Sequence, residues 1–265
     1  ALDAISIRAA RGAVTGILGA NGAGKSTLFL NLNGVLTPSG GRVLLDGKEV
    51  SYTRRDLPEL RRRVGIVFQD PDDQLFSADV YRDISFGAVN LGLPPEEVRR
   101  RVELAMERTG VTAPRDKPTH ALSYGQKKRV AIAGVLVMEP SVMILDEPTA
   151  GLDPQGVSEL MRLLTALRAQ LEMTILLATH DMDIVPLYCD YAYVLSGGRV
   201  AGEGPAEELV CRPGLLRENH LRLPRMAHLM EILAEEDGVD LPRSAATIGA
   251  VRRAVLELLN KEETR

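Results

Sequence analysis

Short apolar runs, separated by polar turns and by helical stretches, set the pattern of this chain. The runs of strand length occupy residues 14–18, 43–45, 64–68, 142–145, 174–178 and 191–195. The run at 43–45 ends in Asp46-Gly47, a dipeptide typical of a hairpin, and Gly197-Gly198 forms a predicted turn before Val200. Strands that alternate with helices in this way predict an α/β fold with a largely parallel sheet covered on both faces.

Two other parts of the chain follow a helical pattern. Residues from about 76 to 139 are mostly helical in pattern, with one helix beginning at Pro94-Pro95 and another near Ser123. Towards the end of the chain, apolar side chains recur at helical spacing over 226–233 and again over 248–259. We expect these last helices to pack on each other, and an interface with another chain is the alternative.

Composition and charge narrow the class of protein. The 265 residues carry a net charge of −4, contain no Trp, and only 4% of them are aromatic. Proteins that mainly neutralise nucleic-acid phosphates are usually basic, so direct binding to nucleic acid is disfavoured. Cys189 and Cys211 lack metal-ligand spacing and fit a reducing compartment. The residues from Ala1 onward do not show a signal-peptide pattern, and the sequence contains no apolar run long enough to cross a membrane, so we expect any work at a membrane to go through a partner.

A glycine-rich loop follows the first apolar run. The residues from Gly19 to Thr27 fit the pattern G-x-x-x-x-G-K-[ST] and lie between a predicted strand and a predicted helix over 26–33. Glycines let backbone N–H groups turn inward, and the helix start adds partial positive charge, so the loop is suited to phosphates. Lys25 would reach the terminal phosphates, and the Ser26 hydroxyl would ligate Mg²⁺. The candidate nucleotide-binding residues of the loop are Gly19, Asn21, Gly22, Ala23, Gly24, Lys25, Ser26 and Thr27.

Acidic and histidine side chains follow two of the later runs. Asp146 and Glu147 come directly after the run over 142–145, and His180 comes shortly after the run over 174–178. Open α/β sheets bind ligands at the carboxyl ends of their strands, which places these side chains near a nucleotide. We expect Asp146 to hold Mg²⁺, and Glu147 to orient or deprotonate an attacking water. His180 is expected to contact the terminal phosphate.

The segment Leu122–Arg129 offers a second place for an anion. Ser123 and Gly125 stand at a predicted helix start, where backbone N–H groups point outward. The chain therefore has one lysine-bearing loop but a second helix start suited to phosphate. A sandwich explains this arrangement, because each nucleotide would be held by the Lys25 loop of one subunit and the Ser123 helix of another.

These motifs together resemble the ATP-binding-cassette family of transport ATPases. The motifs occur in the family's order, as Gly19–Thr27, Gln69, Leu122–Gln126, Asp146-Glu147, Ala150–Asp153 and His180. The resemblance implies a P-loop NTPase core with a mostly parallel sheet, an inserted helical subdomain and a C-terminal helical extension. It divides the chain into a RecA-like core (1–75 and 140–205), a helical signature subdomain (76–139) and an extension (206–265) that is a possible dimer contact.

The resemblance also implies a mechanism. Two copies form a head-to-tail homodimer around two ATP molecules with Mg²⁺, and a heterodimer with a paralogue is the alternative. Glu147 is the general base, His180 contacts the γ-phosphate, and Asp153 lies in the loop that joins the two sites. Gln69 senses Mg²⁺ and the attacking water. The implied ligands of Mg²⁺ are Ser26, Gln69 and Asp146. The implied contacts to the nucleotide of the opposite subunit are Ser123, Gly125 and Gln126.

Two features depart from the family pattern. Tyr124 stands where the family usually has Gly, and a bulky residue there disfavours positive φ and crowds the approach. Because Ser123 and Gly125 remain, we expect a functional signature with an altered dimer affinity. Family members also carry an aromatic residue upstream of the first motif that stacks on adenine, and no Phe or Tyr precedes Phe29. We expect the natural chain to begin before Ala1.

The segment Phe68–Phe76 narrows the resemblance to the ATPases of energy-coupling-factor importers, and the run over 123–129 is similar to their cobalt and nickel branch. Vitamin importers of the same type are the alternative. The implied partners are a transmembrane coupling protein, whose helices dock near Gln69, and a substrate-binding membrane protein. The ATPase would be peripheral, on the cytoplasmic face of the cell membrane. Residues 70–83 carry five Asp against one Arg, or −4, which suits arginine-bearing partner helices; a solvated charged face is the alternative.

Other functions fit the chain less well. Cassette ATPases of DNA repair need a long coiled-coil insertion, and those that act on ribosomes usually carry two cassettes per chain; neither feature is found. A GTPase would need an N-K-x-D guanine motif in the sheet, and this sequence lacks that motif. A non-catalytic binding module would be favoured if Glu147 or His180 were missing, and both are present.

Overall fold

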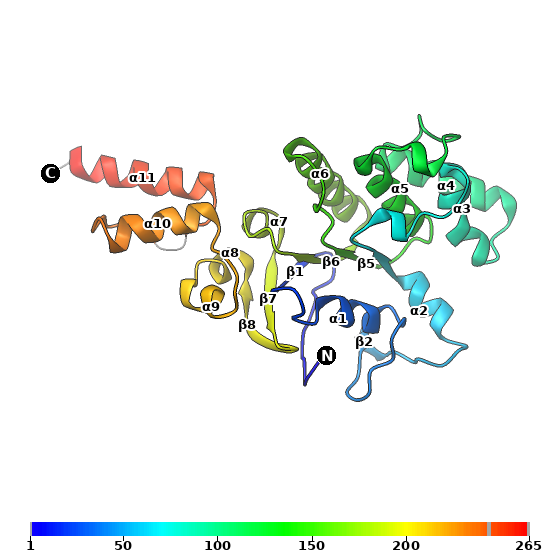
Figure 1. The fold of residues 1–265 in the computed structure, drawn as a ribbon, viewed down its shortest axis with the longest axis horizontal. Coiled ribbons are helices and arrows are strands. Elements are labelled where there is room, and N and C mark those ends of the chain that lie inside the picture. The colour runs from blue at the N-terminus through cyan, green and yellow to red at the C-terminus, as the bar shows by residue number, and fades with distance from the viewer. Residues whose placement is uncertain (1, 243–244, 264–265) are drawn as a thin grey trace. The chain divides into compact units, whose positions relative to one another are not determined.

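The computed structural model describes residues 2–242 and 245–263, with the side chains of the last helix described as far as Asn260. Contacts within the chain divide it into two units. The first unit comprises residues up to 9, residues 13–25 and residues from 179 onward, and the second unit comprises residues 10–12 and 26–178. Each unit holds strands together with helices (Figure 1).

Strands in both directions form the sheet of the first unit. β1 (Val14–Leu18) is buried along its whole length and pairs in parallel with β7 (Tyr191–Ser196). β8 (Arg199–Pro205) pairs antiparallel with β7. The predicted turn between β7 and β8 is confirmed, because Gly197 and Gly198 both have positive φ (+54° and +79°), as a tight hairpin turn requires. A strand buried on both faces does not alternate apolar and polar positions, and in β1 the apolar Val14, Ile17 and Leu18 are buried together with Thr15 and Gly16.

Short helices share the apolar core of these strands. α7 (Val185–Tyr188), α8 (Ala206–Leu209) and α9 (Pro213–Glu218) contribute to one cluster with residues of β1 and β7. The segment that begins at residue 206 is therefore packed into the first unit from its start. The predicted division of the chain into core and extension stays a prediction.

The last two helices have a core of their own. α10 (Arg225–Glu235) and α11 (Ile248–Glu263) lie side by side (Figure 1). Their apolar cluster includes Met230 of α10 and Val251 of α11, both of which are buried. The two C-terminal helices predicted from the apolar spacing are thus confirmed, and each covers the apolar face of the other.

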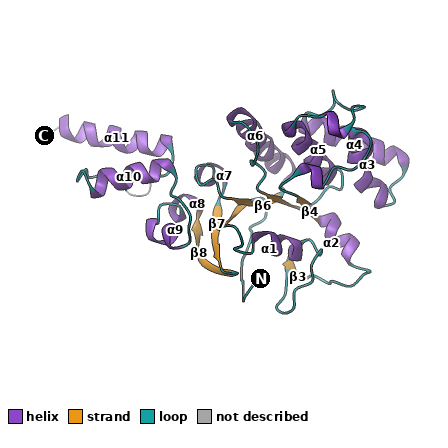
Figure 2. Ribbon diagram, viewed as in Figure 1, coloured by secondary structure: helices purple, strands orange, loops and turns teal. Residues whose placement is uncertain are grey.

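Parallel strands form the sheet of the second unit. β4 (Val64–Val67), β5 (Val142–Asp146) and β6 (Thr174–Thr179) pair in parallel in that order (Figure 2). β2 (Leu44–Leu45) and β3 (Lys48–Glu49) form the small hairpin predicted at Asp46-Gly47. β4, β5 and β6 each lie on an apolar run of the sequence, and their parallel pairing confirms the α/β class with a mostly parallel sheet.

Helices of the second unit begin and end at local signals. α1 (Lys25–Leu32) starts one residue before the predicted helix, directly after the glycine-rich loop. α2 (Leu57–Arg63) lies in an arginine-rich segment and ends on three arginines, which favour the negative end of the helix dipole. α6 (Pro154–Leu171) starts after Asp153, whose side chain accepts the N–H of Gly156 at 2.6 Å.

The helical middle of the chain is confirmed. α3 (Val80–Asn90), α4 (Pro95–Thr109) and α5 (Tyr124–Leu136) pack against one another in the second unit (Figure 1). Short 3₁₀ turns, η1 (Pro71–Asp73) and η2 (Thr119–Ala121), precede α3 and α5. Both helix starts predicted for this stretch are found. Among the described residues, no helix combines the length and the apolarity needed to span a bilayer.

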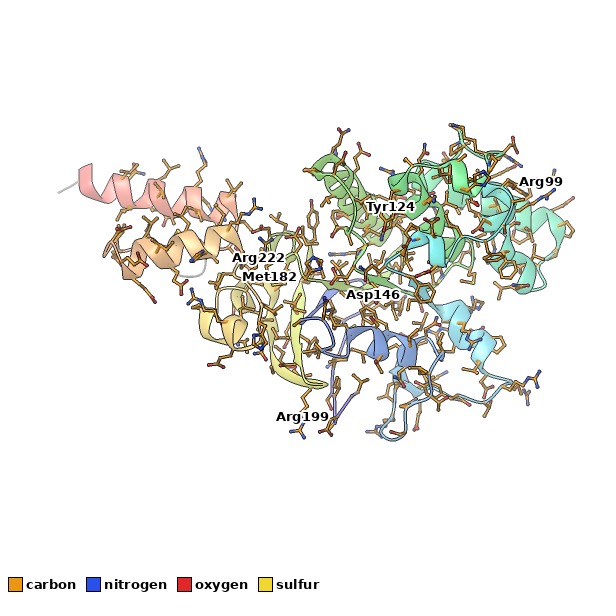
Figure 3. All side chains as sticks on the ribbon, viewed as in Figure 1. Arg99, Tyr124, Asp146, Met182, Arg199 and Arg222 are labelled. Carbon is orange, nitrogen blue, oxygen red and sulfur yellow. The ribbon has the colours of Figure 1, made fainter. Side chains whose placement is uncertain are left out.

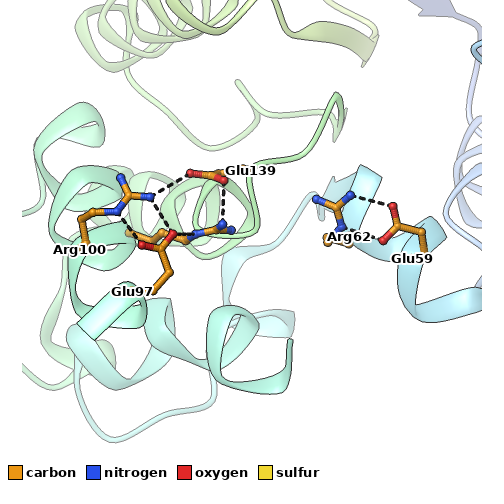
Figure 4. Close-up of polar contacts among 6 residues, drawn as sticks. Glu59, Arg62, Glu97, Arg100 and Glu139 are labelled. Carbon is orange, nitrogen blue, oxygen red and sulfur yellow. Dashed lines mark hydrogen bonds and ion pairs between the residues drawn. The ribbon is translucent and has the colours of Figure 1, made fainter. Parts of the chain in front are cut away.

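A network of charged side chains joins α4 to the loop before β5 (Figure 4). Glu97 accepts from Arg100 at 2.7 Å and from Arg101 at 2.6 Å, and Arg101 also pairs with Glu139 at 3.0 Å. Hydrogen bonds from Arg100 and Arg101 lower the pKa of Glu97 to about 2. The side chains of this network range from 16% exposed for Arg101 to 56% for Arg100, so solvent screens its ion pairs in part and their contribution to stability is modest.

Candidate functional site

The glycine-rich loop runs directly into α1. Gly22 and Gly24 have φ of +82° and +105°, values that favour glycine, and the N–H of Ala23 donates to the carbonyl of Ala20 at 3.1 Å. The first residue of the helix is Lys25. A loop of this backbone conformation, ending at a helix N-terminus, is the arrangement that holds phosphate groups with backbone N–H donors.

Lys25 is anchored inside this loop. Its side chain is 7% exposed, and Nζ donates to the carbonyls of Gly19 at 2.6 Å and Ala20 at 3.3 Å. Because an ammonium group has three donors, one remains for a phosphate oxygen. Gly19 is required by packing, since a Cβ there would lie 2.6 Å from the carbonyl oxygen of Leu195. Three other residues were predicted for this loop. Asn21 is exposed, Ala23 is buried, and Thr27 lies within α1.

Ser26 and Asp146 meet in the second unit. The Ser26 hydroxyl at the start of α1 donates to Oδ2 of Asp146, the last residue of β5, at 2.7 Å. Mg²⁺ prefers oxygen ligands and is usually held by one or two protein groups together with phosphates and water. A hydroxyl and a carboxylate at this separation fit such an ion. The third predicted ligand, Gln69, lies in the loop after β4, and its main-chain carbonyl accepts hydrogen bonds from Tyr124 and Lys128.

Glu147 turns the chain sharply at the end of β5. Its φ is +45°, its side chain is buried, and its N–H donates to the carbonyl of Ala178 in β6 at 3.1 Å. A non-glycine residue in this region costs of order 1–3 kcal/mol, so the surrounding strands must hold it there. Residues held in this way cluster at functional sites. The strand pairing thus fixes a buried carboxylate beside Asp146, where the sequence predicts the base.

His180 lies just after β6, in the first unit, and is exposed. The residues that follow it are attached to the start of the C-terminal helices. Arg222 pairs with Asp181 at 3.2 Å and with Asp183 at 3.4 Å, and the N–H of Arg225 donates to Asp183 at 2.7 Å (Figure 3). The loop that carries the predicted phosphate contact is therefore positioned by charged contacts to the beginning of α10.

The second predicted anion site carries its own helix cap. Ser123 accepts the N–H of Gln126 at 3.3 Å, and the Gln126 side chain accepts the N–H of Ser123 at 3.0 Å. The Ser123 hydroxyl keeps its own proton for a further acceptor. Gly125 lies in the first turn of α5, where an added Cβ would have room, with Leu152 at 3.7 Å. The three predicted residues line a small cavity of about 160 Å³.

The backbone at Tyr124 does not have the positive φ that a bulky side chain would disfavour. Tyr124 is the first residue of α5, and a helical residue needs negative φ, which suits any side chain. Its ring packs on Gly151, where a Cβ would lie 2.8 Å from a ring carbon, and its hydroxyl lies 3.4 Å from the carbonyl of Gln69 (Figure 3). The altered dimer affinity stays a prediction.

The segment that carries Gln69 is bound along α5. The Lys128 ammonium group donates to the main-chain carbonyl of Gln69, and Lys127 pairs with Asp72 at 2.6 Å. Gln74 accepts from the N–H of the residue that follows β4 at 3.2 Å and donates to a carbonyl of α5 at 3.2 Å. The loop after β4 and the helix that starts at the signature are thus connected by several side chains.

Lys128 is a buried cation. It is 1% exposed, and its ammonium group lies 5.5 Å from the centre of the Tyr124 ring. Burial lowers the pKa of Lys128 to about 8, although the carboxylates of Asp70, Asp146 and Glu147 act in the opposite direction. Those carboxylates include both members of the predicted catalytic pair, so Lys128 belongs to the electrostatic surroundings of the site.

The acidic strip over residues 70–83 is largely used within the second unit. Asp70 and Asp79 accept backbone N–H groups at the starts of η1 and α3, at 3.0 and 2.8 Å. Asp83 accepts two backbone N–H groups of the preceding loop, at 3.0 and 2.8 Å, and Asp72 pairs with a lysine of α5. Helix caps and local contacts therefore account for much of the charge that the sequence assigned to partner docking.

Two features of the site were not predicted from the sequence. The contact of Lys128 with Gln69 joins residues far apart along the chain, and the same holds for the packing of Tyr124 on Gly151. The sequence held one local signal for the contact of Lys128 with Gln69, because Tyr124 and Lys128 are spaced by one helical turn and share a face of α5. Nothing in the sequence indicated what that face would contact.

Comparisons with known proteins agree with this geometry. The profile of a family described as ABC transporter matches residues 2–150. A protein named energy-coupling factor transporter ATP-binding protein EcfA3, from Clostridium perfringens, is 57% identical over 261 residues, which cover 98% of this chain and 92% of that protein.

Solved structures show the same fold. The structure of cbiO1 from Clostridium perfringens, described as part of the ABC transporter complex cbiONQ, has a TM-score of 0.76 and 60% identity, covering 87% of this chain and 92% of that one. A dimeric ATP-binding cassette in a post-hydrolysis state, bound to ADP and Pi, has a TM-score of 0.70 and 25% identity, covering 77% and 90%. These similarities confirm the predicted fold class, a P-loop NTPase core with a mostly parallel sheet.

Proposed function

Because this chain belongs to the ABC transporter family and is an ATPase of that family, we propose that it energises an energy-coupling-factor importer for cobalt or nickel ions. The similarity to an energy-coupling factor ATP-binding protein supports the type of importer, and the metal cargo is proposed from the run over 123–129, which resembles the cobalt and nickel branch of these ATPases. The observation that carries the ATPase site is the contact of Ser26 with Asp146, next to the strained, buried Glu147.

ATP and Mg²⁺ are the proposed ligands of the phosphate loop. Backbone N–H groups of residues 19–24 and the Lys25 ammonium group hold the phosphates, and Asn21 and Thr27 complete the loop. Ser26 and Asp146 hold Mg²⁺, with Gln69 as the third proposed ligand. When bound, Mg²⁺ neutralises charge on the β- and γ-phosphates. The hydrogen bond between Ser26 and Asp146 supports this assignment, because one ion can bind both oxygens when they lie this close together.

Hydrolysis is assigned to Glu147 and His180. The Glu147 carboxylate accepts a proton from water as the water oxygen bonds to the γ-phosphorus, and the bond from that phosphorus to ADP breaks. His180 donates a hydrogen bond to the γ-phosphate and so stabilises the charge that develops there. Gln69 orients the attacking water. The products are ADP and inorganic phosphate.

A second copy of the chain completes each nucleotide site in this proposal. Ser123, Gly125 and Gln126 of the opposite copy contact the γ-phosphate at the start of α5, and Asp153 lies in the loop that joins the two sites. A ligand that bridges two copies favours the closed dimer by its differential binding to that state. After hydrolysis, repulsion between the products reopens the interface. A heterodimer with a paralogue would use the same contacts.

Membrane partners are proposed to act on two surfaces. A transmembrane coupling protein docks near Gln69, where Phe76 and Phe86 are 66% and 47% exposed and their rings meet edge to face at 4.7 Å. α10 and α11 contribute a dimer contact, in which the exposed Ile248 and Leu259 take part. The ATPase is then peripheral on the cytoplasmic face of the membrane, next to the coupling protein and a substrate-binding membrane protein.

The base assignment is tested by Glu147→Gln. We expect ATP turnover to fall by about 10²-fold or more, because the amide cannot accept the proton, while ATP binding persists and a dimer accumulates. Glu172→Gln is the matched control, since Glu172 also has positive φ (+49°) but lies at the end of α6. Phosphate release and size-exclusion chromatography with ATP are the measurements. Wild-type turnover in Glu147→Gln would refute the assignment.

The shared nucleotide is tested by mixing two inactive variants. Lys25→Ala lacks the phosphate-loop cation, and Ser123→Arg blocks the signature. A mixed dimer contains one site with both residues intact, so mixing should restore activity towards about half of the wild-type value per dimer. No recovery, together with proven mixing of the chains, would contradict the sandwich. Uptake of Co²⁺, Ni²⁺ and vitamins by the complex with its membrane partners then identifies the cargo.

A further inference from the structure

Lys128 is the charged side chain that the structure buries most completely near the site. It is 1% exposed, whereas the exposed arginines of α4 are open to solvent. Burying an ammonium group costs several kcal/mol unless partners replace its water, and apolar residues of similar size are often as good for stability. A buried lysine is therefore weak evidence for stability and calls for another explanation.

The described partners of Lys128 lie on functional segments. Its ammonium group donates to the main-chain carbonyl of Gln69, which lies in the loop after β4 and is proposed to orient the attacking water. The helix that carries Lys128 begins at Tyr124 and is capped by Ser123, the proposed contact to the nucleotide of the opposite copy. Tyr124 adds a second contact, because its hydroxyl lies 3.4 Å from the same carbonyl.

We propose that Lys128 is a positioning residue for hydrolysis, which fixes the main chain of Gln69 to the helix that begins at Ser123. This inference rests on the function proposed above. As a consequence, a phosphate that binds at the start of α5 also fixes the position of Gln69, because Lys128 connects the two segments. Lys128 does not touch the nucleotide in this scheme, and it acts through the Gln69 carbonyl.

The neighbouring lysine provides a built-in comparison. Lys127 also joins α5 to the loop after β4, through an ion pair with Asp72 at 2.6 Å, but the Asp72 side chain is 58% exposed. Exposed ion pairs of this kind are worth about 0–1 kcal/mol and are screened by salt. If any attachment of the loop after β4 to α5 were enough for hydrolysis, both lysines would contribute to kcat. The proposal assigns the effect to the buried contact with Gln69.

The experiment compares Lys128→Met, Lys128→Arg and Lys127→Met in the full chain with ATP. Lys128→Met keeps the length of the side chain and removes the donor, so kcat should fall about tenfold while KM for ATP changes less than about threefold. Lys128→Arg keeps a donor and should recover most of kcat. Lys127→Met should stay within about twofold of wild type. The unfolding midpoint of Lys128→Met should not fall, because the buried charge is replaced by an apolar side chain.

Lys128→Gln and Glu147→Gln, measured alongside, separate a positioning role of Lys128 from a structural one. Lys128→Gln retains a shorter donor without charge, and its kcat should lie between those of the methionine and arginine variants. Glu147→Gln, measured in the same assay, tests the proposed function by itself. Wild-type kcat in Lys128→Met with loss in Glu147→Gln would overturn the role of Lys128 and leave the function standing. Equal loss of kcat in the methionine and arginine variants, with lowered midpoints, would also overturn it, because the role would then be structural.

Discussion

The two helix starts that are proposed to hold phosphate are built in different ways. The phosphate loop before α1 is made by backbone, with glycines at positive φ and a lysine tied to loop carbonyls. The start of α5 is made by side chains, with Ser123 and Gln126 capping each other and the ring of Tyr124 packed on Gly151. Both present a helix N-terminus, and they differ in what satisfies their own donors: main-chain carbonyls of the loop in the first, and the side chains of Ser123 and Gln126 in the second.

This difference indicates how each start meets a nucleotide. A loop whose N–H groups turn inward around a lysine is ready for phosphates in the chain that carries it. A helix start with a complete cap is stable without a ligand. The donors that remain for a ligand are the hydroxyl proton of the cap residue and the next backbone N–H groups. Such a start suits a nucleotide that arrives bound to another copy. Substitutions that change the backbone of one start or the side chains of the other test this difference directly.

The largest effect is expected for Gly19→Ala in the backbone-built start. A Cβ there would lie 2.6 Å from the carbonyl oxygen of Leu195 and 2.9 Å from the Cβ of Ala23, so the loop must shift. We expect the affinity for ATP to fall about tenfold or more, because a displacement of about 1 Å misplaces the phosphate donors. Gly40→Ala is the control, since a Cβ there meets nothing within 4 Å. Titration with a fluorescent ATP analogue measures both, and equal affinities would argue against a backbone-built site.

A medium effect is expected for Gly151→Ala in the side-chain-built start. The added Cβ would lie 2.8 Å from the Tyr124 ring, at φ of +76°. The overlap and the left-handed backbone together should lower the free energy of unfolding by about 1–3 kcal/mol. In a Tyr124→Ala background the overlap is gone, so the same substitution should cost about 1 kcal/mol less.

Urea unfolding of the four chains in this cycle provides the measurement. Additive effects of Gly151→Ala and Tyr124→Ala would show that the ring does not hold the start of α5 against Gly151. Coupled effects, with ATP binding to the phosphate loop unchanged, would show that the two starts are built independently.

The smallest effect is expected for Glu97→Gln in the exposed network of α4, which belongs to neither start. Its arginine partners lower the pKa of Glu97 from 4.5 to about 2. A carboxyl with a lowered pKa in the folded state stabilises above its unfolded pKa, and this contribution disappears as the pH falls from about 4.5 towards about 2. The variant should therefore lose less stability than wild type over that interval.

Unfolding by urea at several pH values between 6 and 3 checks this difference. Glu96→Gln removes a neighbouring carboxylate of the same helical turn and leaves the contacts of Glu97 in place, so it serves as control. Identical slopes for wild type and Glu97→Gln would show that the network has no linkage to folding.

Several elements of the fold followed from local signals. The run before the glycine-rich loop, the Asp46-Gly47 turn and the helix starts at Pro95 and Tyr124 were all predictable, because each depends on a few adjacent residues. α2 was not singled out, since its seven residues are mostly charged and show only a short apolar pattern. The acidic strip over residues 70–83 left two interpretations open for a related reason, because helix caps and surface charge look alike in a sequence.

Local patterns in the sequence were enough to find the candidate groups: the phosphate loop, the acidic pair after β5, the capped start of α5 and the histidine after β6. Glycine spacing and apolar runs that end in carboxylates act locally, so a single sequence displays them. The contacts of Lys128 with Gln69, of Tyr124 with Gly151 and of Arg222 with the loop after His180 came from the fold alone. Those contacts join residues far apart along the chain, and only packing brings them together.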